Sequence, residues 1–188
     1  MNIFGYELLK YCIIIKTIDM KEYVELACRT MTFKDYEEDS VHMFRGVFTE
    51  VAEVLDIFKK HDAYGKEIDR DHLQEELGDI YWYIAVWSRL LEYDFVESTP
   101  QRVVSVDDVL FSMAQRAWSV LNTSHAEYYL QQLLNSADSL CIYLGFDPNV
   151  VRVKNIEKLM KRYPNGFSET DAIFNRGDAK ETLDGTSN

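Results

Sequence analysis

Long stretches of this chain contain none of the residues that interrupt helices. The 188 residues include only three prolines and eight glycines, and neither type occurs between Pro100 and Gly145. Proline and glycine are the strongest local breakers of a helix, so their scarcity favours long helices. Apolar residues recur at helical spacing along these stretches, and no alternating strand pattern competes with them. The sequence therefore predicts an all-α protein.

Capping and termination signals divide the chain into six predicted helices. The signals are Asp39-Ser40, Asp69 or Asp71, the turn at residues 122–124, Gly145 and Asp147-Pro148. The resulting helices cover residues 20–31, 41–61, 69–91, 106–121, 124–144 and 148–162. In the second helix one apolar face is formed by Phe44, Phe48, Val51, Leu55 and Phe58. In the third, the predicted inner side is formed by Leu73, Leu77, Ile80, Ile84, Trp87 and Leu91.

The length suits one domain with its own core, which we expect to cover residues 1–176. Residues 1–19 differ in character from the rest. They are either an extension ahead of a working start at Met20 or a short helix that packs on the bundle. Residues 94–148 form a predicted helical hairpin, and residues 177–188 are small and polar and are expected to be a frayed tail.

Net charge and cysteine usage limit the binding partners and the cellular compartment that we expect for this protein. A formal net charge of −12 disfavours binding to duplex DNA or to an anionic membrane, although a metal can still bring an acidic nucleotide to an acidic protein. Cys12, Cys28 and Cys141 share no metal-ligand spacing and are predicted to be free thiols in a reducing compartment. The apolar run at residues 11–15 is too short to cross a bilayer and lacks the features of a secretory signal. We therefore expect a cytoplasmic protein.

Two acidic pairs, Glu50-x-x-Glu53 and Glu76-x-x-Asp79, lie in successive predicted helices. The spacing alone carries little information, because Glu22-x-x-Glu25 repeats it on an ordinary solvated helix. What separates the two later pairs is their apolar surroundings. A spacing of i, i+3 also places both members of each pair on one helix surface.

A short loop joins these two helices, so they are predicted to be antiparallel neighbours whose four carboxylates converge. Like charges crowded on an apolar surface are unfavourable unless a cation offsets them. An all-carboxylate set suits Mg²⁺, with Mn²⁺ as a possible substitute. A di-iron bundle would need Glu-x-x-His pairs, which neither helix supplies, and His72 is expected to be a neighbour of the site rather than a ligand.

Three ordered blocks resemble the MazG-like nucleoside triphosphate pyrophosphohydrolases, of the all-α superfamily that includes dimeric dUTPases and dCTP pyrophosphatases. The first two are GVFTEVAEVLDIFKK and EELGDIYWYIA, which carry the two acidic pairs with 22 residues between them. The third is NIEKLMKRYPNGFS, from Asn155 to Ser168. The resemblance covers residues 41–93 and 149–176. The long stretch 94–148 departs from the compact members of the family.

The resemblance implies Mg²⁺-dependent cleavage of the α–β anhydride of a nucleoside triphosphate, in the housekeeping of nucleotide pools. It implies that Mg²⁺ is held by Glu50, Glu53, Glu76 and Asp79, and that Glu53 orients the attacking water. Contacts with the nucleotide are implied for Lys59, Tyr83, Asn155, Lys158 and Arg162. A homodimer or dimer of dimers is also implied, unless the inserted helices take over that role within one chain.

Several alternatives stay open at the level of sequence. The chain could be a catalytically silent helical bundle that serves as a binding or regulatory module, or a phosphoribosyl-ATP pyrophosphohydrolase of the same superfamily. Trp82 and Trp87 could stack on a base, but tryptophans on a packed helix more often belong to the core. The base and sugar of the nucleotide cannot be read from these residues.

Overall fold

The computed structural model describes residues 17–167, and these residues form six helices and no strand. The prediction of an all-α fold is therefore confirmed. The helices are α2 (Met20–Cys28), α3 (Tyr36–Tyr64), α4 (Arg70–Leu90), α5 (Val106–Asn122), α6 (Ala126–Tyr143) and α7 (Pro148–Arg162). The predicted tail and residues 1–16 of the predicted extension lie outside the described residues.

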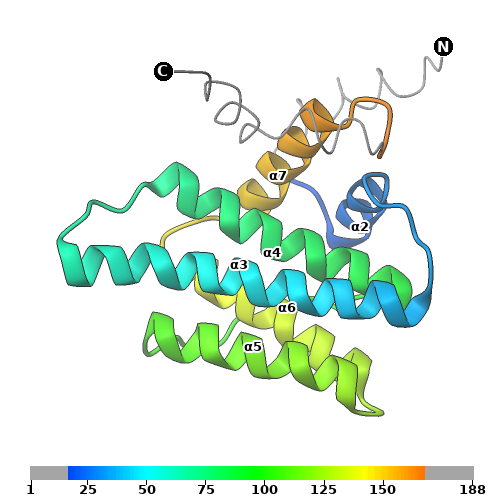
Figure 1. Cartoon of the computed structure of the whole chain (residues 1–188), viewed down its shortest axis with the longest axis horizontal. Helices are drawn as coiled ribbons and strands as arrows, with labels where there is room; N and C mark the ends of the chain where they lie inside the picture. The colour runs from blue at the N-terminus through cyan, green and yellow to red at the C-terminus, as the bar shows by residue number, and fades with distance from the viewer. Residues whose placement is uncertain (1–16, 168–188) are drawn as a thin grey trace, which may run out of the picture.

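Four of the helices form a bundle, and α4 is its central member. The antiparallel pair α3–α4 packs against the pair α5–α6, with α5 against α3 and α6 against α4 (Figure 1). On the opposite side α2 and α7 cross α4 and contact one another. The predicted hairpin at residues 94–148 thus completes a four-helix bundle within one chain.

The position of α4 follows from its composition. Its predicted inner side is buried from Leu73 to Trp87, whereas Leu91 at the end is only half-buried. Tyr81, Ala85 and Val86 are fully buried as well, so most of the circumference of the helix is covered by protein. The second half of α4, residues 80–88, is almost entirely apolar, and such a segment belongs at the centre of a fold.

The start of α3 differs from the prediction. Asp39-Ser40 was the expected N-cap, but the helix begins one turn earlier and its N-cap is Asp35, whose carboxylate accepts hydrogen bonds from the backbone N–H groups of Glu37 and Glu38. Asp39 is buried within the first turn and accepts a hydrogen bond from the Lys34 N–H at 2.8 Å. Both aspartates are good N-caps. The earlier one prevails because three acidic residues in the first turn suit the positive end of the helix dipole.

The predicted apolar face of α3 is confirmed only in part: Val51 is buried and Phe44 and Phe58 pack against the core. Phe48 and Leu55 are exposed, at 51% and 37%, while the residues that enter the core are Met43, Val47, Val51 and Val54. Phe44 stays partly buried beside Trp118 of α5, with ring centroids 5.8 Å apart. The helix has apolar residues on two flanks. The flank of smaller side chains, which allows close contact with α4, is the one that is buried.

The remaining boundaries lie within three residues of their predictions. Asp69 caps α4, Asp147 caps α7, and Gly145 after α6 has a positive φ of 77°. At the beginning of the described chain Ile18 is buried and Asp19 caps α2. The last residues of the predicted extension are therefore part of the fold.

An extended segment between α4 and α5, residues 92–105, runs along α6. Three polar side chains spaced by four residues on α6 bind its backbone: Gln131 accepts from the Val96 N–H, Asn135 from the Thr99 N–H and Ser139 from the Gln101 N–H, over 2.8–3.3 Å. This ladder replaces the hydrogen bonds that a strand or helix would give the segment. The connection is therefore held along its length rather than left as an open loop.

Candidate metal centre

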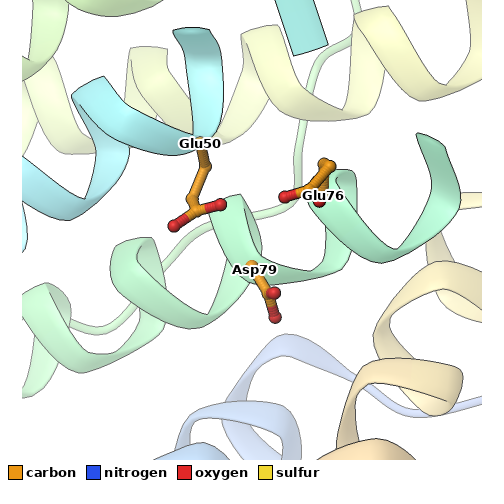
Figure 2. A group of neighbouring side chains, drawn as sticks. All are labelled: Glu50, Glu76 and Asp79. Carbon is orange, nitrogen blue, oxygen red and sulfur yellow. The ribbon is translucent and has the colours of Figure 1, made fainter. Parts of the chain in front are cut away.

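Three carboxylates from two helices meet between α3 and α4. One oxygen each of Glu50, Glu76 and Asp79 lies within 4.8 Å of the others, and all three side chains are half-buried. Figure 2 shows Glu50 reaching from α3 toward Glu76 on α4, with Asp79 one turn further along α4. Within residues 17–167 this is the one group of three or more potential metal ligands at such distances. Glu22 and Glu25, which share the spacing, belong to no such group.

The proximity of these acids perturbs Glu50. Its pKa is raised to about 8, first by burial, then by the hydrogen bond it shares with Glu76, and further by the negative charges of Asp79 and Glu76. Burial and like charges both disfavour the ionised carboxylate. Without a divalent cation the group therefore holds a proton that such a cation would displace.

Asp79 is bound from the other side by α7. The Lys158 ammonium lies 2.6 Å from both carboxylate oxygens, and the Asn155 amide donates to Oδ1 at 2.9 Å. In Figure 2 the Asp79 side chain points away from α3, toward the helices on the far side of α4. Asp79 thus links the acidic group on α3–α4 to the residues of α7. The family resemblance implied nucleotide contacts for Asn155 and Lys158, and the structure places both of them at the Asp79 carboxylate.

Glu53 and Lys59 do not join this group. Glu53 is exposed on α3 and is the one member of the predicted ligand set outside the three carboxylates. Lys59 forms an ion pair with Asp56, and Lys59 and Lys60 together lower the pKa of Asp56 to about 2. The roles predicted for Glu53 and Lys59 stay predictions.

Tyr83 of α4 packs its ring against α3 at Gly46, one turn before Glu50. A Cβ atom on Gly46 would come within 2.0 Å of the Tyr83 ring, so the ring rests directly on the helix backbone at this glycine. Its ring centroid is 6.1 Å from that of His42 and 4.8 Å from that of Trp82. These aromatic side chains are grouped at one end of the acidic group.

The two tryptophans of α4 have structural roles. Trp87 is 1% exposed and belongs to the core. The Trp82 indole N–H donates to the Thr30 hydroxyl at 2.8 Å, which fixes the ring against the end of α2. The core interpretation of Trp87 is confirmed, and Trp82 is held by protein contacts.

A groove of about 710 Å³ runs between α4 and α7 next to Asp79. It is lined by four cationic side chains, those of Lys154, Lys158, Lys161 and Arg162, together with Asp71, Glu75 and Glu157. Cations outnumber acids here although the chain as a whole carries a formal charge of −12. Arg162, for which the resemblance implied a contact with the nucleotide, lines this groove at the end of α7.

The donor set fits a hard divalent ion. Three carboxylates in mutual reach are the ligands that Mg²⁺ and Mn²⁺ prefer. The pKa of Glu50 is raised by burial first and then by the neighbouring acids, whose charge an ion would neutralise. His72 Nδ1 lies 3.2 Å from Glu76 Oε1, where it orients one of the carboxylates from outside the group. This is the neighbouring role expected for His72.

Some residues of the site escaped the sequence reasoning. Gly46 carried a signal, because a glycine inside a helix often marks a close approach of another group. Lys154 and Lys161 lie at helical spacing from Lys158 and could have been added from that spacing. Tyr23, whose hydroxyl donates to Asn155 Oδ1 at 2.8 Å, had no signal, since the two residues are 132 positions apart.

Comparison of the chain with protein-family models, with curated proteins and with solved structures gave no match. In the described part of the chain, no helix combines the length and the apolar character that crossing a membrane requires.

Proposed function

We propose that this protein is a Mg²⁺-dependent nucleoside triphosphate pyrophosphohydrolase that cleaves the α–β anhydride of its substrate and releases a monophosphate and pyrophosphate. The observation that carries the proposal is the approach of Glu50, Glu76 and Asp79 to within 4.8 Å, beside a groove in which cations outnumber acids. A metal held by carboxylates next to cationic side chains is what a polyphosphate needs before water can attack it. The order of the three sequence blocks supports the same class of reaction.

In this proposal the acidic residues bind the metal and orient the attacking water. Bound Mg²⁺ would neutralise phosphate oxygens and polarise the phosphorus centre. Glu50, Glu76 and Asp79 would hold it, and Glu53, which is exposed and outside this group, would orient the attacking water.

Lys158 has a double role in this proposal. In the metal-free protein its ammonium offsets the charge of Asp79 at 2.6 Å. Once a divalent ion takes over that charge, the ammonium is available to a phosphate oxygen, together with the cations further along the groove. Tyr83 at the other end of the acidic group would face the sugar or the base.

The fold bears on the expected assembly. Helices α5 and α6 complete a four-helix bundle around α3 and α4, so this pair is covered without a second subunit. A homodimer or dimer of dimers is proposed on the basis of the sequence resemblance alone. Nucleotide-pool housekeeping in the cytoplasm is likewise proposed, and it is compatible with the free thiols of Cys28 and Cys141.

The decisive experiment is to incubate the protein with each NTP and dNTP and Mg²⁺, and to measure pyrophosphate and orthophosphate separately. We expect pyrophosphate from at least one nucleotide, and loss of turnover in Asp79→Asn with the helical circular dichroism retained. Glu25→Gln is the matched control, because Glu25 is an exposed acid of an identical spacing on α2. Orthophosphate as the only product would refute the proposed bond.

The same experiment addresses the silent helical bundle. If the chain is only a binding module, no nucleotide yields either product. In that case Glu50→Gln should leave the free energy of unfolding unchanged or raise it, because it removes an acid whose pKa is raised by burial and by its neighbours. Turnover that is lost in both Glu50→Gln and Asp79→Asn but kept in Glu25→Gln would exclude that alternative.

A further inference from the structure

A chain of hydrogen bonds connects α2 to the metal ligand Asp79 through α7. The Tyr23 hydroxyl donates to Asn155 Oδ1 at 2.8 Å, and Asn155 Nδ2 donates to Asp79 Oδ1 at 2.9 Å. Tyr23 is completely buried and Asn155 is 3% exposed. Bulk water therefore has little access to the bond between Tyr23 and Asn155, whereas the bond from Asn155 to Asp79 is part-buried. A hydrogen bond shielded from water is strong and specific in direction.

The chemistry of the three groups fixes the orientation of the amide. An ionised carboxylate only accepts hydrogen bonds, so Asn155 must present its NH₂ group to Asp79. The amide oxygen then faces the opposite way, where the Tyr23 hydroxyl is its donor. If that hydroxyl were removed, the buried amide oxygen would lose this donor, and the amide would be held only from its NH₂ end.

The helices leave room for this arrangement at one point. A Cβ atom on Gly78 of α4 would lie 3.0 Å from Asn155 Cβ and 3.1 Å from Nδ2, so the glycine permits α7 to approach the α4 backbone beside Asp79. The Tyr23 hydroxyl also lies 3.5 Å from the Gly78 carbonyl oxygen. Helix α2 contacts both α4 and α7, and Tyr23 is the residue that it places at their junction.

We propose that Tyr23 is a positioning residue, which holds the Asn155 amide and thereby fixes the rotamer of the Asp79 carboxylate for metal binding. The inference rests on the metal centre of the proposed function, but not on the identity of the substrate or of the bond that is cleaved. Partners that orient a ligating carboxylate typically change metal affinity by about 10- to 100-fold. Because Tyr23 acts through Asn155, we expect the low end of this range.

The test compares two buried tyrosines that differ in what they bind. Tyr23→Phe removes the hydroxyl that contacts Asn155. Tyr81→Phe removes a hydroxyl of equal burial that donates to Asp138, away from the acidic group, and the rings of Tyr23 and Tyr81 touch edge-on. Mn²⁺ affinity is measured by calorimetry and by the electron paramagnetic resonance signal of free Mn²⁺, and the Tm is measured in a chelator.

We expect Tyr23→Phe to weaken Mn²⁺ binding about tenfold and Tyr81→Phe to leave it within about twofold, although both lower the metal-free Tm. In an Asn155→Ala background, Tyr23→Phe should have no further effect on Mn²⁺ affinity, because its route to Asp79 is gone. Unchanged affinity in Tyr23→Phe, equal losses in the two tyrosine variants, or additive losses with Asn155→Ala would each overturn the positioning role. A wild-type protein that binds no Mn²⁺ would overturn it as well.

The outcomes separate this inference from the proposed function. A protein that binds Mn²⁺ but releases no pyrophosphate from any nucleotide refutes the proposed reaction only. The comparison of the tyrosine variants is then still decided by their Mn²⁺ affinities. The converse outcome is a protein that releases pyrophosphate while its Tyr23→Phe variant binds Mn²⁺ as tightly as the wild type. That outcome supports the proposed function and refutes the role of Tyr23.

Discussion

Metal binding to this site should be coupled to the release of one proton, from Glu50. Burial, the hydrogen bond that protonated Glu50 donates to Glu76, and the neighbouring negative charges hold the pKa of Glu50 at about 8 in the metal-free protein. A carboxylate must be ionised to ligate Mg²⁺ or Mn²⁺. Below pH 8 the ion therefore competes with a proton, and its affinity should rise with pH until Glu50 is ionised.

The size of the effect follows from the same pKa. With a pKa of about 8, Glu50 is about 3% ionised at about pH 6.5 and about 76% ionised at about pH 8.5. The affinity for the ion should therefore increase about 25-fold between these two pH values. Binding should release close to one proton per ion at the lower pH and about a quarter of a proton at the higher pH.

Titration calorimetry with Mn²⁺ in buffers of different ionisation enthalpy measures both quantities. Glu50→Gln is the control, because it keeps the shape of the side chain and every other titrating group but cannot bind or release this proton. The pH dependence should disappear in the variant, with weaker binding at about pH 8.5. A wild-type affinity that is constant over this range, or proton release that persists in Glu50→Gln, would refute the reasoning.

The stability of the metal-free protein should change with pH in the opposite direction. Since the pKa of Glu50 is higher in the folded protein than its ordinary value of 4.5, the folded state binds more protons than the unfolded state between those values. The free energy of unfolding contributed by this group therefore falls as pH rises through pH 4.5–8. Urea unfolding in the presence of a metal chelator measures this effect. The free energy of unfolding of Glu50→Gln should rise relative to that of the wild type as the pH increases toward about 8.

Three further changes test the packing around the site. Gly46→Ala places a methyl group within 2.0 Å of the Tyr83 ring, and should lower the free energy of unfolding in urea by about 1–3 kcal/mol and weaken Mn²⁺ binding. Arg152→Met removes the partner of buried Asp138, whose Oδ1 lies 3.2 Å from the guanidinium, and should cost about 3–5 kcal/mol in the same assay. Asn135→Ala removes an acceptor of the segment 92–105, and hydrogen exchange should accelerate in that segment while Mn²⁺ affinity is unchanged.

The helical fold could be predicted because the information for it is local. Scarce glycine and proline, helical spacing of apolar residues and capping aspartates are read within a few residues of one another. Where two caps compete, as Asp35 and Asp39 do before α3, the charges that follow each cap help to decide between them. The three acidic residues after Asp35 favour the earlier cap, and this signal is also local.

The buried face of α3 could be predicted only in part. A helix with apolar residues on two flanks has no unique inner face in its sequence. The structure buries the flank that contains Gly46, because the glycine admits the Tyr83 ring to the helix backbone. Close approach between helices selects small residues, and hydrophobicity alone does not show which partner will come close.

The acidic group shows the same division between local and long-range information. The i, i+3 spacing placed Glu76 and Asp79 on one surface correctly, and the short loop brought Glu50 to them. For Glu53, the same spacing gave no information on whether its side chain would turn toward the group or toward solvent. The bond from Tyr23 to Asn155 joins residues 132 positions apart, and no pattern in a single sequence encodes it.

The position of Asp79 explains why a site of three acids depends on four helices. Its backbone is on α4, the neighbouring acid Glu50 is on α3, and its hydrogen-bond partners are on α7, which Tyr23 of α2 contacts at Asn155. A change that only displaces α7 would leave all three carboxylates present but would release Lys158 and Asn155 from Asp79. The charge near the group would then become more negative, and the carboxylate rotamer would be free. Metal affinity in such variants should therefore be governed by the geometry at Asp79, not by the number of ligands.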